Sequence, residues 1–336
     1  MSDTVRVGVV GAGAIAQVAH LVVLSKLEGV EIAGLCDMDI PKAQALSRRF
    51  SVPYLYDDIE DLLARGKPDA VVICTPNHLH QVHTVSALSV GVPVLCERPL
   101  ALSVSGVERV GAAQEAAGVP LLVGMNLRYR NDVQAVRSFL VGGELGSLRN
   151  VRAHWHIFRP TGIPAGWRER RAESGGGAML DLGLPLLDLA LWLAECPATK
   201  RVSAMFSSRN GTNRVEDFAG VHLQCTDGHS VFIDVSWRHV GPQEKFGFEI
   251  VGDQGSASVA PLSVYKEMHG APVNVTPELA DDSQDPFSRS YQAEWEHFLR
   301  IVRGETPAPD LAEQLLLHQT MEAIQRSARE GREVIL

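Results

Sequence analysis

The sequence has 336 residues, a formal net charge of −9, 45% hydrophobic residues and 21% charged residues. This length allows two domains with separate cores, and the composition is ordinary for a soluble globular protein. The negative charge argues against nucleic acid or an anionic membrane surface as the main partner, and no apolar run approaches the roughly 20 residues of a membrane span.

The start of the sequence and the spacing of the cysteines both bear on the expected location of the protein. The first residues show no basic-then-apolar leader, so we expect a cytoplasmic location. The five cysteines are scattered and form no Cys-x-x-Cys pair. We therefore expect reduced thiols and no structural zinc.

Strand and helix signals alternate over the first 125 residues, which predicts a parallel sheet covered by helices on both faces. Strands are expected at 5–10, 31–36, 70–74, 93–96 and 120–123, and helices at 14–27, 41–50, 80–90 and 103–117. Because such sheets bind ligands at the carboxyl ends of their strands, the motifs that follow these strands should lie along one edge.

The first predicted strand runs directly into a glycine turn. Gly11 and Gly13 would let backbone amides approach a pyrophosphate, and the small Ala16 would let the next helix pack on the sheet. The second strand ends at Asp37, near the roughly 20-residue distance expected of a carboxylate that binds an adenosine ribose. This pattern predicts a dinucleotide site and favours NAD over NADP.

After residue 130 the pattern changes to long alternating segments. A helix is expected at 132–140, and strands at 148–158, 201–208, 218–226, 230–239 and 246–252. Their period of two predicts a half-exposed antiparallel sheet. Helices are expected at 177–194, 287–303 and 311–329, and a polar surface loop at 272–285.

The predicted fold class is therefore α/β. Residues 1–125 form a doubly wound parallel sheet that binds the dinucleotide. Residues 126–336 form an α+β domain with a large, open-faced, mainly antiparallel sheet that binds substrate and mediates oligomerisation. The C-terminal helices of the second domain could pack back on the first.

Segments spread along nearly the whole sequence carry a family resemblance. They read GAGAIA (11–16), TPNHLH (75–80), CERPLA (96–101), GGGAMLDLG (175–183), EIVGDQG (249–255) and AEWEHF (293–298). In this order they resemble the glucose–fructose oxidoreductase and inositol dehydrogenase family, Gfo/Idh/MocA. The resemblance implies a Rossmann domain with a nicotinamide cofactor, substrates among sugars, inositols and related polyols, and a homodimer or homotetramer formed through the C-terminal sheet.

Two motifs depart from the family pattern. The family's Glu-Lys-Pro reads Glu97-Arg98-Pro99, and Pro185 replaces the histidine of Asp-x-Gly-x-His-x-x-Asp. The resemblance would assign proton transfer and substrate orientation to the missing lysine and histidine. Arg98 stays protonated and cannot accept a proton, but it can stabilise an alkoxide, a carboxylate or a phosphate. The Arg98–Pro99 bond is a candidate cis peptide.

Pro185 has a local structural consequence as well. Proline removes the backbone donor that would bond to the Asp181 carbonyl, so a kink or a later helix start is expected there. Asp181 is interpreted as a cleft carboxylate, with a helix-start carboxylate as the alternative. Arg98 could instead simply pair with Glu97 or Asp181.

The candidate site residues fall into three groups. The catalytic candidates are Arg98, Asp181, His80 and Tyr129. The expected cofactor-binding residues are Gly11, Gly13, Ala14, Ile15, Asp37, Thr75, Pro76, Asn77, His80, Glu97, Arg98 and Asn126. The expected substrate-binding residues are Arg98, Arg128, Trp167, Arg168 and Asp181. His154 and His156 share one side of a strand, but no third ligand is evident, so no metal site is predicted.

Three functions follow from these residues. The first is an NAD(P)-dependent oxidoreductase that acts on a sugar, inositol or related hydroxy compound, with Asp181, His80, Tyr129 or a relayed water as an atypical proton acceptor. The second is a cofactor-binding sensor or complex subunit that has lost this chemistry. The third is an enzyme that cleaves glycosides with NAD through a transient oxidation.

Overall fold

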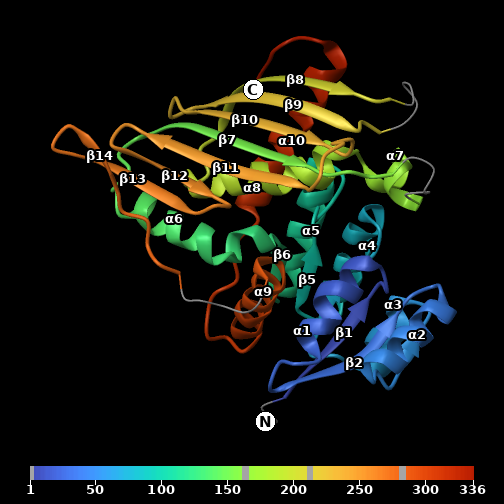
Figure 1. Cartoon of the computed structure of the whole chain (residues 1–336). Helices are drawn as coiled ribbons and strands as arrows, with labels where there is room; N and C mark the ends of the chain where they lie inside the picture. Colours follow the sequence, from blue (N-terminus) through green and yellow to red (C-terminus); the bar gives the residue numbers. More distant parts are fainter. Residues whose placement is uncertain (1–3, 161–165, 210–214, 280–284) are drawn as a thin grey trace. The chain divides into compact units, whose positions relative to one another are not determined.

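The computed structural model describes residues 4–160, 166–209, 215–279 and 285–336. The contacts divide the protein into two compact units (Figure 1). Unit 1 comprises Met1–Tyr129 and Gln284–Leu311, and unit 2 comprises Arg130–Ser283 and Ala312–Leu336. Residues 284–311 thus pack with the N-terminal unit, whereas the division of binding functions between 1–125 and 126–336 stays a prediction.

Unit 1 contains a six-stranded parallel sheet in the order β3-β2-β1-β4-β5-β6. The strands are β1 (Val5–Val10), β2 (Val30–Cys36), β3 (Leu55–Tyr56), β4 (Ala70–Ile73), β5 (Val94–Glu97) and β6 (Leu121–Gly124). This is the doubly wound order of dinucleotide-binding sheets, with its switch point between β1 and β4. The predicted fold class of this part is confirmed. The two-residue strand β3 is too short to carry a periodic signal and was not predicted.

Unit 1 also contains helices, all but the last of which lie between or directly after these strands in the sequence. They are η1 (Ala16–His20), α1 (Leu21–Leu24), α2 (Ile40–Phe50), α3 (Ile59–Asp61), η2 (Leu62–Gly66), α4 (Asn77–Ser89), α5 (Val104–Ala117), η3 (Asn126–Tyr129) and α9 (Pro286–Val302). Local capping sets several ends: the Asp39 carboxylate accepts from the amide of Lys42 at the start of α2, and Ser103 caps α5. Gly118 ends α5 in a left-handed conformation.

Unit 2 contains a nine-stranded sheet in the order β14-β13-β12-β11-β7-β10-β9-β8-β15. The strands are β7 (Leu148–His156), β8 (Thr199–Ser207), β9 (Phe218–Cys225), β10 (Ser230–Ser236), β11 (Lys245–Gly252), β12 (Gly255–Val259), β13 (Ser263–Met268), β14 (Ala271–Asn274) and β15 (Val334–Ile335). Strand β7 pairs in parallel with β10, whereas the other neighbouring strands pair antiparallel. The sheet is therefore mainly antiparallel, as predicted.

One face of this sheet is covered and the other is open. The helices of unit 2 are α6 (Asn131–Val141), η4 (Gly166–Glu169), α7 (Arg171–Ser174), η5 (Met179–Gly183), α8 (Leu184–Leu193) and α10 (Ala312–Glu330). Helix α8 packs on β7 and β10, and α10 packs on β8 (Figure 1). Along β10, Val231, Ile233 and Val235 are buried on the covered face, whereas Phe232 and Asp234 lie on the open face.

The expected surface loop at 272–285 is wrong in part. Residues Ala271–Asn274 form strand β14, which pairs with β13 at the edge of the sheet. An edge strand tolerates a proline because one side of its backbone needs no partner, which is why Pro272 did not prevent the strand. Residues 280–284 lie outside the described residues.

The helix expected at 177–194 is present, because the backbone is helical without a break from Ala178 to Leu193. Its stretch Met179–Gly183 is π-helical and directly precedes α8, which contains Pro185, so the irregularity expected from this proline is a π-helical stretch and not a later helix start. Within the described residues, the stretch Arg171–Leu193 is long and apolar enough to cross a membrane, but 89% of its apolar window is buried in the fold. Such burial is typical of a core helix.

Candidate functional site

The two glycines of the turn after β1 are required for different reasons. Gly11 has φ +98°, and a Cβ atom there would lie 2.7 Å from the backbone of Cys74. At Gly13 a Cβ atom would meet nothing closer than the Cys74 carbonyl oxygen at 3.7 Å. Packing therefore demands Gly11, whereas the open space at Gly13 is where a phosphate could approach the backbone. The neighbouring Ala14 is exposed and Ile15 is half-buried.

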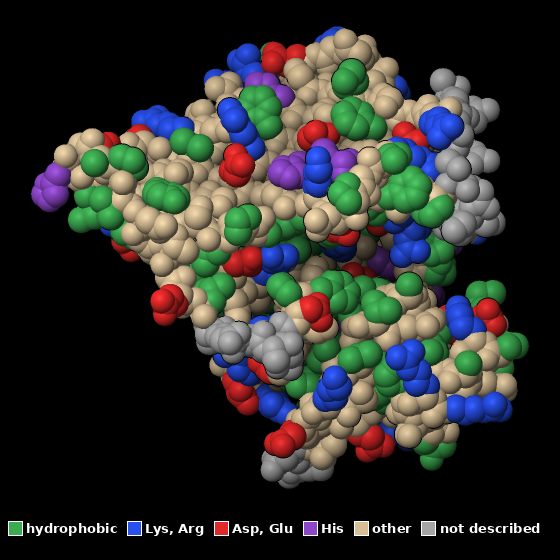
Figure 2. Space-filling model, viewed as in Figure 1, with side chains coloured by type: hydrophobic (Ala, Val, Ile, Leu, Met, Phe, Trp, Pro, Cys, Tyr) green, Lys and Arg blue, Asp and Glu red, His purple; other side chains and the backbone are tan. Residues whose placement is uncertain are grey.

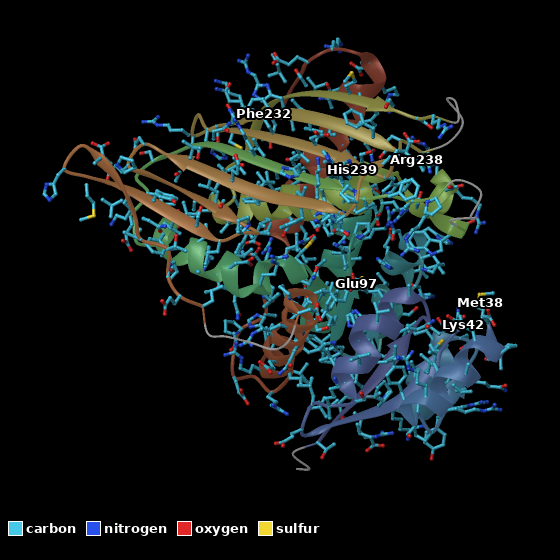
Figure 3. The ribbon with its side chains drawn as sticks, in the orientation of Figure 1. Met38, Lys42, Glu97, Phe232, Arg238 and His239 are labelled. Carbon is cyan, nitrogen blue, oxygen red and sulfur yellow. The ribbon has the colours of Figure 1, made fainter. Side chains whose placement is uncertain are left out.

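Asp37, at the end of β2, is tied to this turn. Its Oδ2 accepts from the amide of Ala12 at 2.7 Å, and its Oδ1 accepts from the amide of Asp39 at 2.8 Å. The ammonium group of Lys42 lies 3.0 Å from Oδ2. Lys42 was not predicted; it lies on α2 beside the exposed Met38 (Figure 3). The carboxylate thus stands beside the glycine turn, where a ribose-binding group is needed.

His80 connects two of the strand-end loops. It is 2% exposed, its Nδ1 lies 2.7 Å from the carbonyl oxygen of Pro99, and its Nε2 lies 2.7 Å from that of Thr75. Burial lowers the pKa of His80, and the two carbonyls oppose this effect. Because both ring nitrogens contact backbone oxygens, the geometry fits a role in holding the loops better than the predicted role in proton transfer. Thr75 also contacts the ring of His83, and Asn77 begins α4 after Pro76.

Glu97 is buried at the end of β5, next to the half-buried Arg98 (Figure 3). Its Oε1 lies 2.9 Å from Nε2 of His20, and its Oε2 accepts from the Arg98 amide at 3.3 Å. Burial alone would raise the pKa of Glu97, but the His20 hydrogen bond and the charge of Arg98 hold it below its usual value. The Arg98–Pro99 bond is cis, which confirms that expectation.

The candidates on η3 contact α9, a helix that comes from near the C-terminus of the sequence. The amide of Asn126 donates to the Ser290 hydroxyl at 3.0 Å, and the ring centroids of Tyr129 and His297 are 5.7 Å apart. Arg128 is half-buried on the same turn. Helix α9 contains the AEWEHF segment. The sequence therefore indicated this motif, but it did not indicate which residues contact it.

In unit 2, Asp181 is held by two side chains that the sequence did not indicate. Arg159 donates to Oδ2 of Asp181 at 2.7 Å, and the Trp237 indole donates to the same oxygen at 2.9 Å. The guanidinium of Arg159 stacks 4.1 Å from the centroid of the Trp237 ring. The Asp181 side chain is 28% exposed. A carboxylate and a guanidinium, both partly exposed, therefore meet against a buried indole.

The predicted pair Trp167 and Arg168 lies on η4. The Arg168 guanidinium is 4.6 Å from the centroid of the Trp167 ring, and both side chains are half-buried. Burial lowers the pKa of Arg159, and the like charge of Arg168 adds to this effect while Asp181 opposes it. Arg168 thus acts electrostatically on the cluster of Asp181, Arg159 and Trp237.

The backbone and the carboxylate of Glu216 lie so close to the glycine run before Asp181 that a larger residue would not fit at Gly177. Oε1 of Glu216 accepts from the amides of Gly177 at 2.8 Å and Met179 at 3.2 Å, and a Cβ atom at Gly177 would lie 1.9 Å from the Glu216 carbonyl oxygen. Arg238 pairs with Asp217 and donates to the carbonyl oxygen of Arg159 at 2.8 Å (Figure 3). These contacts fix the backbone on both sides of the Asp181 cluster.

The open face of the nine-stranded sheet is hollowed over its central strands. The hollow has a volume of about 850 Å³. Histidine and apolar side chains gather on this face (Figure 2). The stacked rings of His222 and Phe232 are 4.2 Å apart, and the rings of His154 and His156 are 5.6 Å apart. Gly220 lines the hollow, and its lack of a side chain leaves space there, whereas the His154 ring packs where a side chain of Gly247 would lie.

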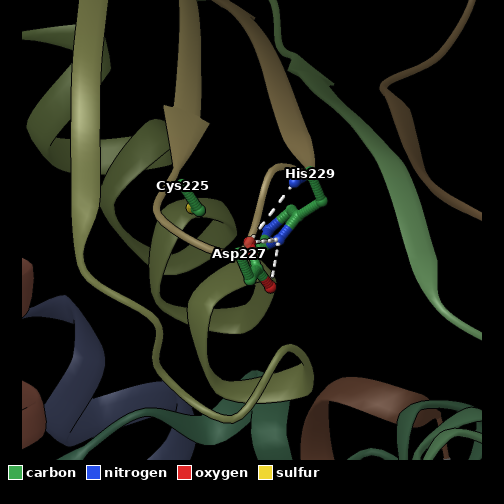
Figure 4. A group of neighbouring side chains, drawn as sticks. All are labelled: Cys225, Asp227 and His229. Carbon is green, nitrogen blue, oxygen red and sulfur yellow. Dashed lines mark hydrogen bonds and ion pairs between the residues drawn. The ribbon is translucent and has the colours of Figure 1, made fainter.

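The hairpin between β9 and β10 brings together three potential metal ligands, Cys225, Asp227 and His229 (Figure 4). The Nδ1 atom of His229 lies 2.7 Å from the Asp227 carboxylate. Burial, followed by the charge of Asp227, raises the pKa of the Cys225 thiol to about 12. The aspartate–histidine contact closes the turn between β9 and β10, so the geometry of the hairpin accounts for the position of these side chains.

The fold and its strand-end residues define a two-domain protein that binds a dinucleotide at a glycine turn. The comparisons with known proteins identify it further. The protein belongs to the Gfo/Idh/MocA family: residues 5–125 match the oxidoreductase family with an NAD-binding Rossmann fold, and residues 133–258 match the GFO/IDH/MocA C-terminal domain. The predicted family, the oxidoreductase class and the NAD cofactor are confirmed.

Similar proteins include two sugar dehydrogenases. The D-glucoside 3-dehydrogenase of Escherichia coli is 28% identical, covering 100% of this chain and 98% of the relative. The D-apiose dehydrogenase of Paraburkholderia graminis is 30% identical, covering 94% and 86%. The crystal structure of GenD2 from gentamicin A biosynthesis, in complex with NAD, is 26% identical with a TM-score of 0.85, covering 99% and 96%.

Proposed function

We propose that this protein oxidises a hydroxyl group of a sugar, an inositol or a related polyol, with NAD as the hydride acceptor. The observation that carries the proposal is the Asp181–Arg159–Trp237 cluster. Sugar hydroxyl groups are recognised by a few precisely placed polar groups, and the partly exposed Asp181 carboxylate and Arg159 guanidinium, which the buried Trp237 holds in place, supply such groups. The names of the two dehydrogenase relatives point to the same substrate class.

Unit 1 would hold the cofactor. The open space at Gly13 fits a pyrophosphate, and Ala14 and Ile15 follow it at the start of η1. Asp37 would accept hydrogen bonds from the adenosine ribose. The remaining proposed contacts come from Thr75, Pro76, Asn77, Glu97, Arg98 and Asn126, with His80 supporting two of these loops. Bound NAD would supply the acceptor for two electrons and one hydrogen.

The acid–base chemistry has to differ from that of a lysine–histidine pair. Arg98 keeps its proton, so it would stabilise the negative charge that develops on the substrate oxygen. We propose that the Asp181 carboxylate accepts the proton of the substrate hydroxyl group, directly or through a water molecule. NAD, when bound, would supply the acceptor for the hydride from the carbon that bears this hydroxyl group. The products are a carbonyl compound, reduced cofactor and a proton. Arg128, Tyr129, Trp167 and Arg168 are proposed to shape the binding of the substrate.

The open sheet face is proposed to join copies of this protein into a homodimer or a homotetramer. Met205 is 64% exposed and Phe232 is 41% exposed on that face, which is much apolar surface for a sheet facing water. A cytoplasmic location accompanies this proposal, because reduced, buried cysteines suit that compartment.

The first experiment mixes the purified protein with NAD and a panel of sugars, inositols and sugar acids. The absorbance of the reduced cofactor should rise with at least one member of the panel. NAD binding is measured in parallel by quenching of tryptophan fluorescence. Bound NAD with no reduction across the whole panel would count against dehydrogenation.

A second candidate function is an NAD-binding sensor or complex subunit. The observation that favours it is the loss of both expected proton-handling side chains, at Arg98 and Pro185. The double variant Arg98→Lys with Pro185→His discriminates between the two functions. Turnover that appears only in this variant would favour the sensor. Sugar release from a glycoside without net reduction of NAD would instead reveal glycoside cleavage.

A further inference from the structure

A series of buried hydrogen bonds runs from α9 to the strand end that carries Arg98. The indole Nε1 of Trp295 donates to Nδ1 of His20 at 3.0 Å, and Nε2 of His20 lies 2.9 Å from Oε1 of Glu97. Trp295 and His20 are completely buried, and Glu97 is 7% exposed. The three residues come from α9, η1 and β5, so the series joins three parts of unit 1 that are distant in sequence.

The direction of these hydrogen bonds is fixed by the indole. An indole N–H can only donate, so Nδ1 of His20 has to accept and carries no proton. Nε2 then carries the single proton of a neutral ring and donates it to the Glu97 carboxylate. Trp295 therefore sets the tautomer of His20, as the partner of one ring nitrogen generally decides the state of the other.

The surroundings keep the negative charge of this region on Glu97. Tyr291 lies edge-on to the His20 ring, with centroids 5.3 Å apart, and also hydrogen-bonds to Glu97. Glu294 is completely buried, and neither of its carboxyl oxygens has a partner among the described residues. Burial, and then repulsion by Glu97, raises the pKa of Glu294 well above its usual value, so this acid stays neutral.

The other charged or titratable groups near the series are Arg98, His80 and Cys74. The charges of Arg98 and His80 both favour the carboxylate form of Glu97. Burial raises the pKa of the Cys74 thiol well above its usual value, so the thiol stays neutral. A second proton on His20 would have to displace the Trp295 donor, so the series is not suited to passing protons.

Arg98 stands between two fixed residues. On one side, Glu97 accepts from His20 and from the Arg98 amide itself. On the other side, the carbonyl oxygen of Pro99 is held by His80. We propose that Trp295 and His20 are positioning residues that act through Glu97 to aim the Arg98 side chain at the reacting hydroxyl group. This inference rests on the role proposed above for Arg98.

The tautomer gives a test that needs no substrate. In protein with 15N-labelled histidine, the His20 ring should carry its proton on Nε2 and none on Nδ1, because Nδ1 accepts from the Trp295 indole. In Trp295→Phe, which keeps an aromatic ring but removes the donor, Nδ1 is free to carry a proton, so its 15N signal should move toward that of a protonated nitrogen. The His20 signal is assigned by its loss in His20→Gln. An imidazolium at His20 in the wild-type protein would overturn the inference.

A matched pair of variants tests the effect on Arg98. His20→Gln keeps an N–H group that can reach Glu97, whereas His20→Leu has a similar volume and no donor. With the best substrate from the panel, His20→Leu should lower kcat roughly 10- to 100-fold, since small misplacements of a reacting group have effects of this size. The KM for NAD should change less than about twofold, and His20→Gln should keep most of the activity.

The tautomer measurement and the kinetic comparison of the His20 variants together distinguish failure of this inference from failure of the proposed function. If no member of the panel is oxidised, the proposed function fails while the tautomer measurement still decides the hydrogen-bond series. If the panel gives turnover and His20→Leu keeps the wild-type kcat, the positioning role is contradicted. A loss of kcat that His20→Gln shares equally would also contradict it, because the donor to Glu97 would then not matter.

Discussion

In unit 1 Asp37 and His80 are held by backbone atoms, whereas in unit 2 Asp181 is held by side chains from distant segments. Asp37 accepts from two backbone amides, and His80 contacts two backbone carbonyls. Asp181 accepts from Arg159 and Trp237. A site built on backbone contacts keeps its shape when neighbouring side chains change. A site built on side chains changes its chemistry with each of them, which suits a unit that selects the substrate.

The largest loss of activity is expected at Asp181, which is held by side chains in unit 2. Asp181→Asn keeps the size of the side chain but removes the proposed proton acceptor, so kcat should fall roughly 100- to 10,000-fold. NAD binding should be unchanged because Asp181 belongs to unit 2. Steady-state kinetics with the best substrate of the panel measures the loss. Glu267→Gln, at an exposed position on β13, is the matched control and should behave as wild type.

Smaller effects on stability and on NAD affinity should distinguish Gly11 from Gly13 in the turn after β1. Gly11→Ala places a Cβ atom against the Cys74 backbone at a positive φ and should lower the free energy of unfolding by about 2 kcal/mol or more. Gly13→Ala meets no such contact, so its stability should stay near that of wild type while the Kd for NAD rises roughly tenfold. Urea unfolding and NAD titration of both variants decide the matter. Equal losses of stability would show that Gly13 also serves packing.

A pH-dependent effect is expected from the buried acid of α9. The pKa of Glu294 is raised in the folded state, so its contribution to stability is complete below the unfolded pKa and is lost as pH rises toward the folded pKa. The unfolding free energy of wild type should therefore fall relative to Glu294→Gln between about pH 5 and about pH 8, by at most about 1.4 kcal/mol per pH unit. Parallel stability curves in urea unfolding would contradict a neutral Glu294.

The same contrast explains what the sequence could predict. The strands of unit 1 are short apolar runs bounded by turns, and glycines and Asp37 follow them directly, so the fold and the position of the glycine turn beside Asp37 were predictable. The irregularity in the helix that contains α8 followed from the chemistry of one residue, Pro185. Arg159, Trp237 and Glu216 belong to segments remote from Asp181, and no local pattern connects them to it.

The Trp295–His20–Glu97 series could be predicted from the sequence only in part. The segment that contains Trp295 was recognisable as a motif, but its contact with His20 spans 275 positions of sequence. His20 lies on an amphipathic segment, where a buried histidine looks like any other core position. Only the three-dimensional packing of α9 against η1 reveals that the two rings share a hydrogen bond.

Transfer of hydrogen from a substrate carbon to the nicotinamide is the central claim, and isotope transfer tests it most directly. The protein is incubated with NAD and C-deuterated glucose, inositol and sugar acids, and the reduced cofactor is analysed by mass spectrometry. The account predicts cofactor that carries one deuterium from wild type and little from Asp181→Asn. Unlabelled or unreduced cofactor from wild type, with NAD shown to be bound, would contradict it.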